Sequence, residues 1–147
     1  MGDFMLHRLN VFATALWWGS MSVVGFLVVP MLFRHLPTAR MAGDMAARLF
    51  TAQTWISVAC TLVLLLTFRR RLTSGTGGVG GSAATTDFGL AVCGMLLALL
   101  LEFVAAPHIR ARDNLPLWHS VGTGLYVLQW LCAGVVLWRA SRGGTAG

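Results

Sequence analysis

One carboxylate stands inside a long apolar run, and its position makes it the first candidate for chemistry in this sequence. Glu102 lies in LALLLEFVAAPHIRAR, residues 97–112, where leucine, alanine, valine and phenylalanine surround it. An ionisable side chain in a membrane-spanning segment is costly, usually faces the interior of the helix bundle, and marks a candidate functional site. Gln53 and Thr123 lie at a similar depth on other apolar runs, and His119 lies slightly nearer the surface. We therefore predict an intramembrane polar cluster of Glu102, Gln53, His119 and Thr123.

Three interpretations of this cluster stay open at the level of sequence. Glu102 can stabilise the bundle by hydrogen-bonding across to Gln53 on the second helix or Thr123 on the fourth. Its carboxylate can instead accept a proton or bind a metal ion or a small cationic solute. The third interpretation is that the side chain simply reaches toward the membrane interface.

Histidines and cysteines supply two further sets of candidate ligands. Three histidines fall on one predicted membrane face, where they could bind a metal, or two of them a haem, although no His-x-x-x-His spacing supports this. Three cysteines lie at a common depth on three helices and could hold a soft metal such as Cu(I), but single cysteines among aliphatic residues are usually small buried hydrophobes. The candidate metal or haem ligands are His7, His35, His108, His119, Cys60, Cys93 and Cys132.

The composition indicates which solvent surrounds these residues. Of 147 residues, 56% are hydrophobic and only 11% are charged, whereas a soluble domain carries about 25% charged residues. Such a chain cannot cover itself with a hydrated surface, so its partner is the lipid bilayer. The basic residues are all arginines, and they flank the apolar runs instead of clustering. The net charge of +6 therefore indicates a membrane protein, and we expect no nucleic-acid partner.

Four apolar runs are long enough to cross a bilayer, which requires about 20 residues. They predict an all-α, polytopic membrane protein, a four-transmembrane-helix bundle forming a single domain over residues 1–147. The first run is too long for a signal peptide, so we expect it to be retained. We expect a protein of the bacterial inner membrane, and the bias of arginines between the two faces predicts that both termini lie in the cytoplasm. The expected helices are about 10–33, 46–68, 87–109 and 117–139, with a flexible linker at about 72–86 and a disordered tail at about 141–147.

The stretches LWWGSMSVVGFLVVPMLFRHLP, MAGDMAARLF and LWHSVGTGLYVLQWLCAGVVL carry a family resemblance. They resemble the domain of unknown function 4149 family, whose animal members are called transmembrane protein 205. The resemblance covers nearly the whole chain, apart from the linker and Glu102, and it implies a four-helix membrane protein without an established activity. A fainter similarity of FMLHRLNVFATALWWGS to copper-resistance and haem-associated membrane proteins keeps His7 among the candidate ligands. The positions that match the family's packing motifs are Trp17, Gly19, Gly25, Pro30, Phe33, Gly43, Phe50 and Tyr126.

These observations favour a non-enzymatic membrane protein, although they leave the question of enzymatic activity open. The sequence contains no nucleophile elbow, no phosphate-binding loop and no pair of carboxylates within a membrane run. Our first hypothesis is that the polar cluster handles a proton, a metal ion or a small cationic solute, with homo-oligomers supplying the thickness that four helices lack. The alternatives are a haem- or metal-binding redox protein, whose cofactor the sequence does not define, and a membrane scaffold without a ligand.

Overall fold

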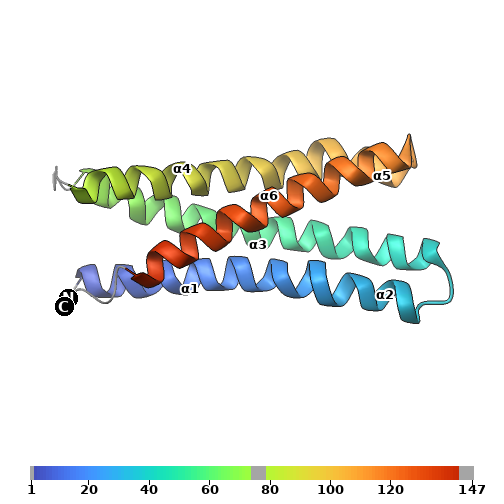
Figure 1. The fold of residues 1–147 in the computed structure, drawn as a ribbon, viewed down its shortest axis with the longest axis horizontal. Coiled ribbons are helices and arrows are strands. Elements are labelled where there is room, and N and C mark those ends of the chain that lie inside the picture. The colour runs from blue at the N-terminus through green and yellow to red at the C-terminus, as the bar shows by residue number, and fades with distance from the viewer. Residues whose placement is uncertain (1, 74–78, 143–147) are drawn as a thin grey trace.

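The computed structural model describes residues 2–73 and 79–142, and all of their long elements are helices (Figure 1). Four helical segments are long and apolar enough to cross a membrane. The predicted fold class, an all-α membrane protein with four transmembrane helices, is therefore confirmed. The elements are α1 (Gly2–Val23), η1 (Val24–Val28), α2 (Val29–His35), α3 (Ala39–Thr73), α4 (Val79–Leu100), η2 (Leu101–Ala105), α5 (Ala106–Ala111) and α6 (Leu115–Arg142).

The four segments run lengthwise beside one another, and each reverses the direction of the one before it (Figure 1). Helices α3 and α6 each pack against both α1 and α4. Helices α1 and α4 therefore lie diagonally opposite each other, as do α3 and α6. The beginning of α1 and the end of α6 lie at the same end of the bundle, which we call the terminal end; the α2–α3 and α5–α6 turns form the loop end.

The bundle is apolar on its outside and partly polar on its inside, the reverse of a soluble domain. Large hydrophobic side chains such as Phe12 and Phe103 are exposed on the outer surface, where lipid would contact them. Inside, Thr14 and Thr61 are fully buried, and each hydroxyl donates to the backbone carbonyl four residues earlier in its own helix. Small hydroxyl residues of this kind allow helices to approach closely in lipid.

Two glycines accept large aromatic rings from another helix. A Cβ atom at Gly25 would lie 2.7 Å from Cε1 of Tyr126, and one at Gly94 would collide with the ring of Trp17, whose side chain is 0% exposed. Within the chain, Gly19 and Gly43 do not take part in the close packing expected of them, because an added Cβ would meet no atom within 4 Å at either position. These two glycines border open space, as does Gly124.

Other members of the packing set behave differently from one another. The rings of Phe50 and Tyr126 pack edge to face with their centroids 5.2 Å apart. Phe33, in contrast, is half exposed on the outer surface. Pro30 occupies the first turn of α2, directly after η1, where its missing N–H is tolerated.

The third membrane segment begins earlier than the sequence indicated. Helix α4 starts at Val79, so residues 79–86 are helical and the linker expected at 72–86 is too long. Asp87 forms an ion pair with Arg139 of α6, which fixes the first turns of α4 against its neighbour. Composition alone missed this part of the helix because glycine, serine and threonine make up most of it. The rest of the expected linker includes residues 74–78, and the expected tail includes residues 143–147; both lie outside the described residues.

Candidate functional site

Glu102 lies in a π-helical turn that a proline imposes on the third membrane segment. The turn η2 closes with a bond from the backbone N–H of Ala106 to the carbonyl of Leu101, five residues back, and Pro107 follows at once. A proline ring clashes with the carbonyl four residues earlier and donates no hydrogen bond, so the wider turn relieves the conflict. Turns of this type are frequent at functional sites because they redirect side chains out of the regular helical register.

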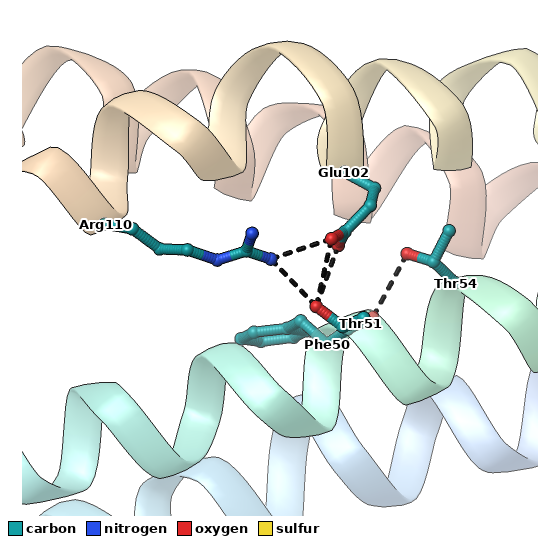
Figure 2. A network of polar contacts seen from close by, with 5 residues as sticks. All are labelled: Phe50, Thr51, Thr54, Glu102 and Arg110. Atoms are coloured by element: carbon teal, nitrogen blue, oxygen red, sulfur yellow. Dashed lines mark hydrogen bonds and ion pairs between the residues drawn. The ribbon is translucent and has the colours of Figure 1, made fainter.

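The carboxylate of Glu102 is held by one hydroxyl and one guanidinium (Figure 2). Thr51 of α3 donates its hydroxyl to the carboxylate, with Oγ1 3.0 Å from both Oε1 and Oε2. Nη2 of Arg110 donates to Oε1 at 2.7 Å and to Oγ1 of Thr51 at 2.8 Å, which closes a triangle of three polar side chains. Helical side chains lean toward the N-terminus of their helix, so Arg110 reaches back two turns to Glu102.

The two charges of this triangle differ in their access to water. The side chain of Glu102 is 11% exposed, whereas that of Arg110 is 45% exposed. The guanidinium therefore lies partly outside the bundle at the end of a long side chain, whereas the carboxylate lies in its wall. We infer from this difference that the anion is fixed and that the cation can move.

The expected hydrogen bonds from Glu102 to Gln53 and Thr123 are wrong. Gln53 donates through Nε2 to the hydroxyl of Ser20 on α1, at 3.0 Å. Thr123 is exposed and donates to the carbonyl of His119, four residues earlier in its own helix. Counting along the runs predicted the depth of these residues but not their faces: Gln53 and Thr51 are two positions apart, which is about 200° around a helix.

A cavity of about 240 Å³ lies beside Glu102 in the half of the bundle nearer the loop end. Its walls come from all four membrane segments and are largely apolar. Three members of the predicted cluster, Glu102, His119 and Thr123, line it, whereas Gln53 does not. The remaining lining residues are Gly25, Phe26, Val29, Ala47, Phe50, Leu101, Ala106, Ile109, Arg110, Gly122, Tyr126 and Val127.

A second, more polar hollow also borders the ion pair. It has a volume of about 560 Å³ and is lined by charged side chains of α3, including Asp44 and Arg48, together with Thr51. Glu102 and Arg110 line both hollows. The ion pair thus borders both the apolar cavity and this polar hollow, which we call the vestibule.

The candidate histidine ligands do not assemble into one site. His108 stacks on Trp118 with ring centroids 4.0 Å apart, and its Nδ1 lies 3.3 Å from Asp113. His35 bonds through Nδ1 to the carbonyl of Met31, and His7 belongs to the terminal end of α1. Within residues 2–73 and 79–142, no three histidine, cysteine, aspartate or glutamate side chains are grouped so that they could hold a metal ion.

The three cysteines are free and occupy different environments. Cys60 is buried, Cys132 is half buried and Cys93 is exposed. Cys93 and Cys132 interact side chain to side chain across α4 and α6, while Cys60 packs in the hydrophobic core. The structure therefore pairs two of the three thiols that the sequence placed at one depth.

Sequence reasoning missed Thr51 and underused Arg110, the two partners of Glu102. Arg110 was not predicted as a member of the polar cluster. Its position two turns after Glu102 in the same helical segment was the available signal, because an arginine can extend that far along a helix. Thr51 had no signal of its own, since it is one of several hydroxyl residues on α3.

Comparison with known proteins gives a family but no activity. A family model described as a domain of unknown function, DUF4149, matches residues 12–114, which include Thr51, Glu102 and Arg110. No curated protein and no solved structure matches the chain significantly.

Proposed function

The chain belongs to the domain of unknown function 4149 family, and from that premise we propose that it binds a small lipophilic cation inside the membrane, with Glu102 as the counter-charge. The observation that carries this proposal is the carboxylate of Glu102 in the wall of a largely apolar cavity. The side chain of its partner cation, Arg110, is 45% exposed, about four times the exposed fraction of Glu102. A bound cation would take the place of the guanidinium.

The charge balance of the cavity favours a cationic ligand. When Arg110 pairs with Glu102, the two charges cancel. When the side chain of Arg110 rotates toward the vestibule, the negative charge of Glu102 in the cavity wall is left without a partner. An unpaired charge in an apolar wall is costly, so a ligand cation that replaces the guanidinium would recover that energy. An anionic ligand would have no such place, because Arg110 is already neutralised by Glu102 at 2.7 Å.

The walls and the volume of the cavity favour a small organic ligand over a bare metal ion. The aromatic rings of Phe26, Phe50 and Tyr126 line the cavity, and such rings attract organic cations through their faces. Pockets for drug-sized ligands measure roughly 300–1,000 Å³, so a cavity of about 240 Å³ suits a smaller molecule. A hard metal ion would need several oxygen ligands, which these walls do not supply.

The direction in which the site opens follows from the proposed orientation. We infer that both termini lie in the cytoplasm of a bacterial cell, because the terminal end carries the basic run that includes Arg69, Arg70 and Arg71. The vestibule at the loop end would then open to the outside of the inner membrane. A ligand would enter from that side or be released to it.

Equilibrium binding of benzyltrimethylammonium to the full chain in mild detergent tests the proposal. This probe is small and permanently charged, and neopentylbenzene has the same shape without the charge. We expect saturable binding that neopentylbenzene does not displace. Glu102→Gln should weaken binding by about tenfold or more, which corresponds to about 1.4 kcal/mol.

Arg110→Gln gives the sharper test, because the proposal predicts that this variant, unlike Glu102→Gln, does not lose affinity for the probe. Removing the competing guanidinium should leave the affinity unchanged or increase it. Asp44→Asn, in the exposed wall of the vestibule, serves as the control and should change the affinity less than about twofold, since a screened surface charge contributes little. Binding that survives Glu102→Gln, or that Arg110→Gln weakens as strongly, would contradict the proposal.

A further inference from the structure

The two halves of the chain repeat one order of backbone features. We call residues 2–73 the first hairpin and residues 79–142 the second hairpin. Each hairpin opens with a long helix that widens into a π-turn and then meets a proline, Pro30 in the first and Pro107 in the second. The closing bonds also agree: Val29 bonds back to Val24 as Ala106 does to Leu101. All of these positions correspond at one shift of 77 positions, for example from 30 to 107.

The buried faces of α1 and α4 coincide under the same shift. In the middle of the two helices, each buried residue of α4 corresponds, at this shift, to a buried residue of α1. Near the terminal end, Asn10 accepts a hydrogen bond from Thr67 of α3, and its counterpart Asp87 pairs with Arg139 of α6. The buried pairs are Thr14 with Ala91, Trp17 with Gly94, and Met21 with Ala98.

The second helices of the two hairpins agree at a shift of 76 positions, one residue less because the turns differ. Five residues of α6 are buried, and each has a buried or half-buried counterpart on α3. Both helices carry a buried glutamine with one hydrogen-bonding atom unused, Oε1 of Gln53 and Nε2 of Gln129. The pairs are Ala46 with Gly122, Phe50 with Tyr126, Gln53 with Gln129, Ser57 with Ala133, and Cys60 with Val136.

Counterparts also meet in space. Helices α1 and α4 run in the same direction on opposite corners of the bundle, and so do α3 and α6 (Figure 1). Trp17 nevertheless crosses the centre to lie on Gly94, its own counterpart, and Phe50 packs against its counterpart Tyr126. Equivalent residues touch each other only beside a symmetry axis. We propose that the two hairpins are copies of one unit, related by a pseudo-twofold axis along the bundle.

The axis passes through the cavity, and this gives the cavity two different sides. Its lining includes four counterpart pairs: Gly25 with Glu102, Val29 with Ala106, Ala47 with Thr123, and Phe50 with Tyr126. Glu102, Arg110 and His119, the lining side chains that carry or can carry a charge, all belong to the second hairpin. If the proposed ligand site is correct, the ligand therefore lies with its charged end toward the second hairpin and its apolar end toward the first. The duplication itself does not depend on that function.

Exchanging counterparts in the full chain tests the duplication. Tyr126 donates its hydroxyl to the carbonyl of Met21, whose counterpart is Ala98. Tyr126→Phe should lower the SDS mole fraction at which the protein unfolds. Adding Phe50→Tyr should recover more than half of that loss, because the proposed pseudo-twofold axis would bring the new hydroxyl to the carbonyl of Ala98. The chain has a single tyrosine, so the resonance Raman signal of the double variant reports the new hydrogen bond directly.

A larger exchange is Trp17→Gly with Gly94→Trp, in which the ring crosses the axis from the other side. The double variant should recover more than half of the decrease in unfolding midpoint that Trp17→Gly alone causes. Trp18 and Gly134 supply the control: they are also in contact, but they are not counterparts, so Trp18→Gly with Gly134→Trp should recover nothing. Recovery in either counterpart exchange without recovery in the control supports the duplication. Failure of both counterpart exchanges, or equal recovery in the control, overturns it.

Discussion

Removing Arg110 should destabilise the protein more than neutralising Glu102 does, although each change breaks the same 2.7 Å ion pair. In Arg110→Gln, the carboxylate of Glu102, whose side chain is 11% exposed, retains only the hydroxyl of Thr51 as a partner. In Glu102→Gln, the guanidinium that remains is 45% exposed, so its side chain can rotate toward solvent. Hydrogen bonds to charged groups contribute about 1.5–3 kcal/mol. We therefore expect a loss of about 2 kcal/mol for Arg110→Gln and, after discounting for the exposed guanidinium, about 1 kcal/mol for Glu102→Gln.

The double variant Glu102→Gln with Arg110→Gln carries the decisive comparison. With both charges gone, its stability should resemble that of Glu102→Gln alone, so the second substitution rescues Arg110→Gln by about 1 kcal/mol. Reversible unfolding in mixed micelles of SDS and a mild detergent measures all three. Arg34→Gln, an exposed arginine at the same end of the bundle, should be neutral. Losses that simply add in the double variant, or a larger loss for Glu102→Gln, would refute a fixed anion with a movable cation.

Three further predictions use the same unfolding assay. Thr51→Val should lower the free energy of unfolding by about 1 kcal/mol, because it removes the hydroxyl that bonds both Glu102 and Arg110 (Figure 2). The control, Thr54→Val, should be nearly neutral, because this buried hydroxyl bonds only to the carbonyl of Phe50 in its own helix. Equal losses in the two variants would contradict this prediction. Gly25→Ala should lower the free energy of unfolding by about 1–3 kcal/mol, because the added methyl group would collide with the ring of Tyr126. Gly19→Ala should be neutral or stabilise the protein by about 0.5 kcal/mol, since nothing lies near that position. A Gly25→Ala variant as stable as the parent protein would disprove the close contact. Gln129→Leu should not destabilise the protein, because it removes a buried donor that has no partner. Gln53→Leu should lower the free energy of unfolding by about 1 kcal/mol, because the amide of Gln53 donates to Ser20. The reverse order of stabilities would refute this prediction.

The membrane fold was predictable because lipid imposes a simple rule on the sequence. Every backbone group must be satisfied within its own helix, so long apolar runs read directly as helices. The ends were less predictable. Helix α4 continues through residues 79–86, where composition favoured a linker, because the ion pair between Asp87 and Arg139 anchors it. Glycine content also predicted close packing in general, but Gly25 and Gly94 accept rings whereas Gly19 borders open space, and composition does not distinguish them.

The candidate site was predictable in depth but not in direction. Glu102 was recognised from its unusual solvent, and the same count placed His119 and Thr123 at the level of the cavity they line. The count could not give the face of each helix, so it chose Gln53 over Thr51. The π-turn changes the register at Glu102 itself, and its only sequence signal is a proline that most often indicates a kink.

The energetics of the ion pair support the proposed cation exchange more than a role in stability. Buried ion pairs contribute weakly to stability, because the attraction between the charges mainly repays the energy needed to remove them from water. Well-packed apolar side chains would fill the positions of Glu102 and Arg110 at no greater cost, and the surrounding wall is already apolar. What apolar side chains cannot supply is a charge whose partner is able to leave. A carboxylate that borders both hollows, paired with a guanidinium whose side chain is 45% exposed, is the arrangement that the proposed cation exchange requires.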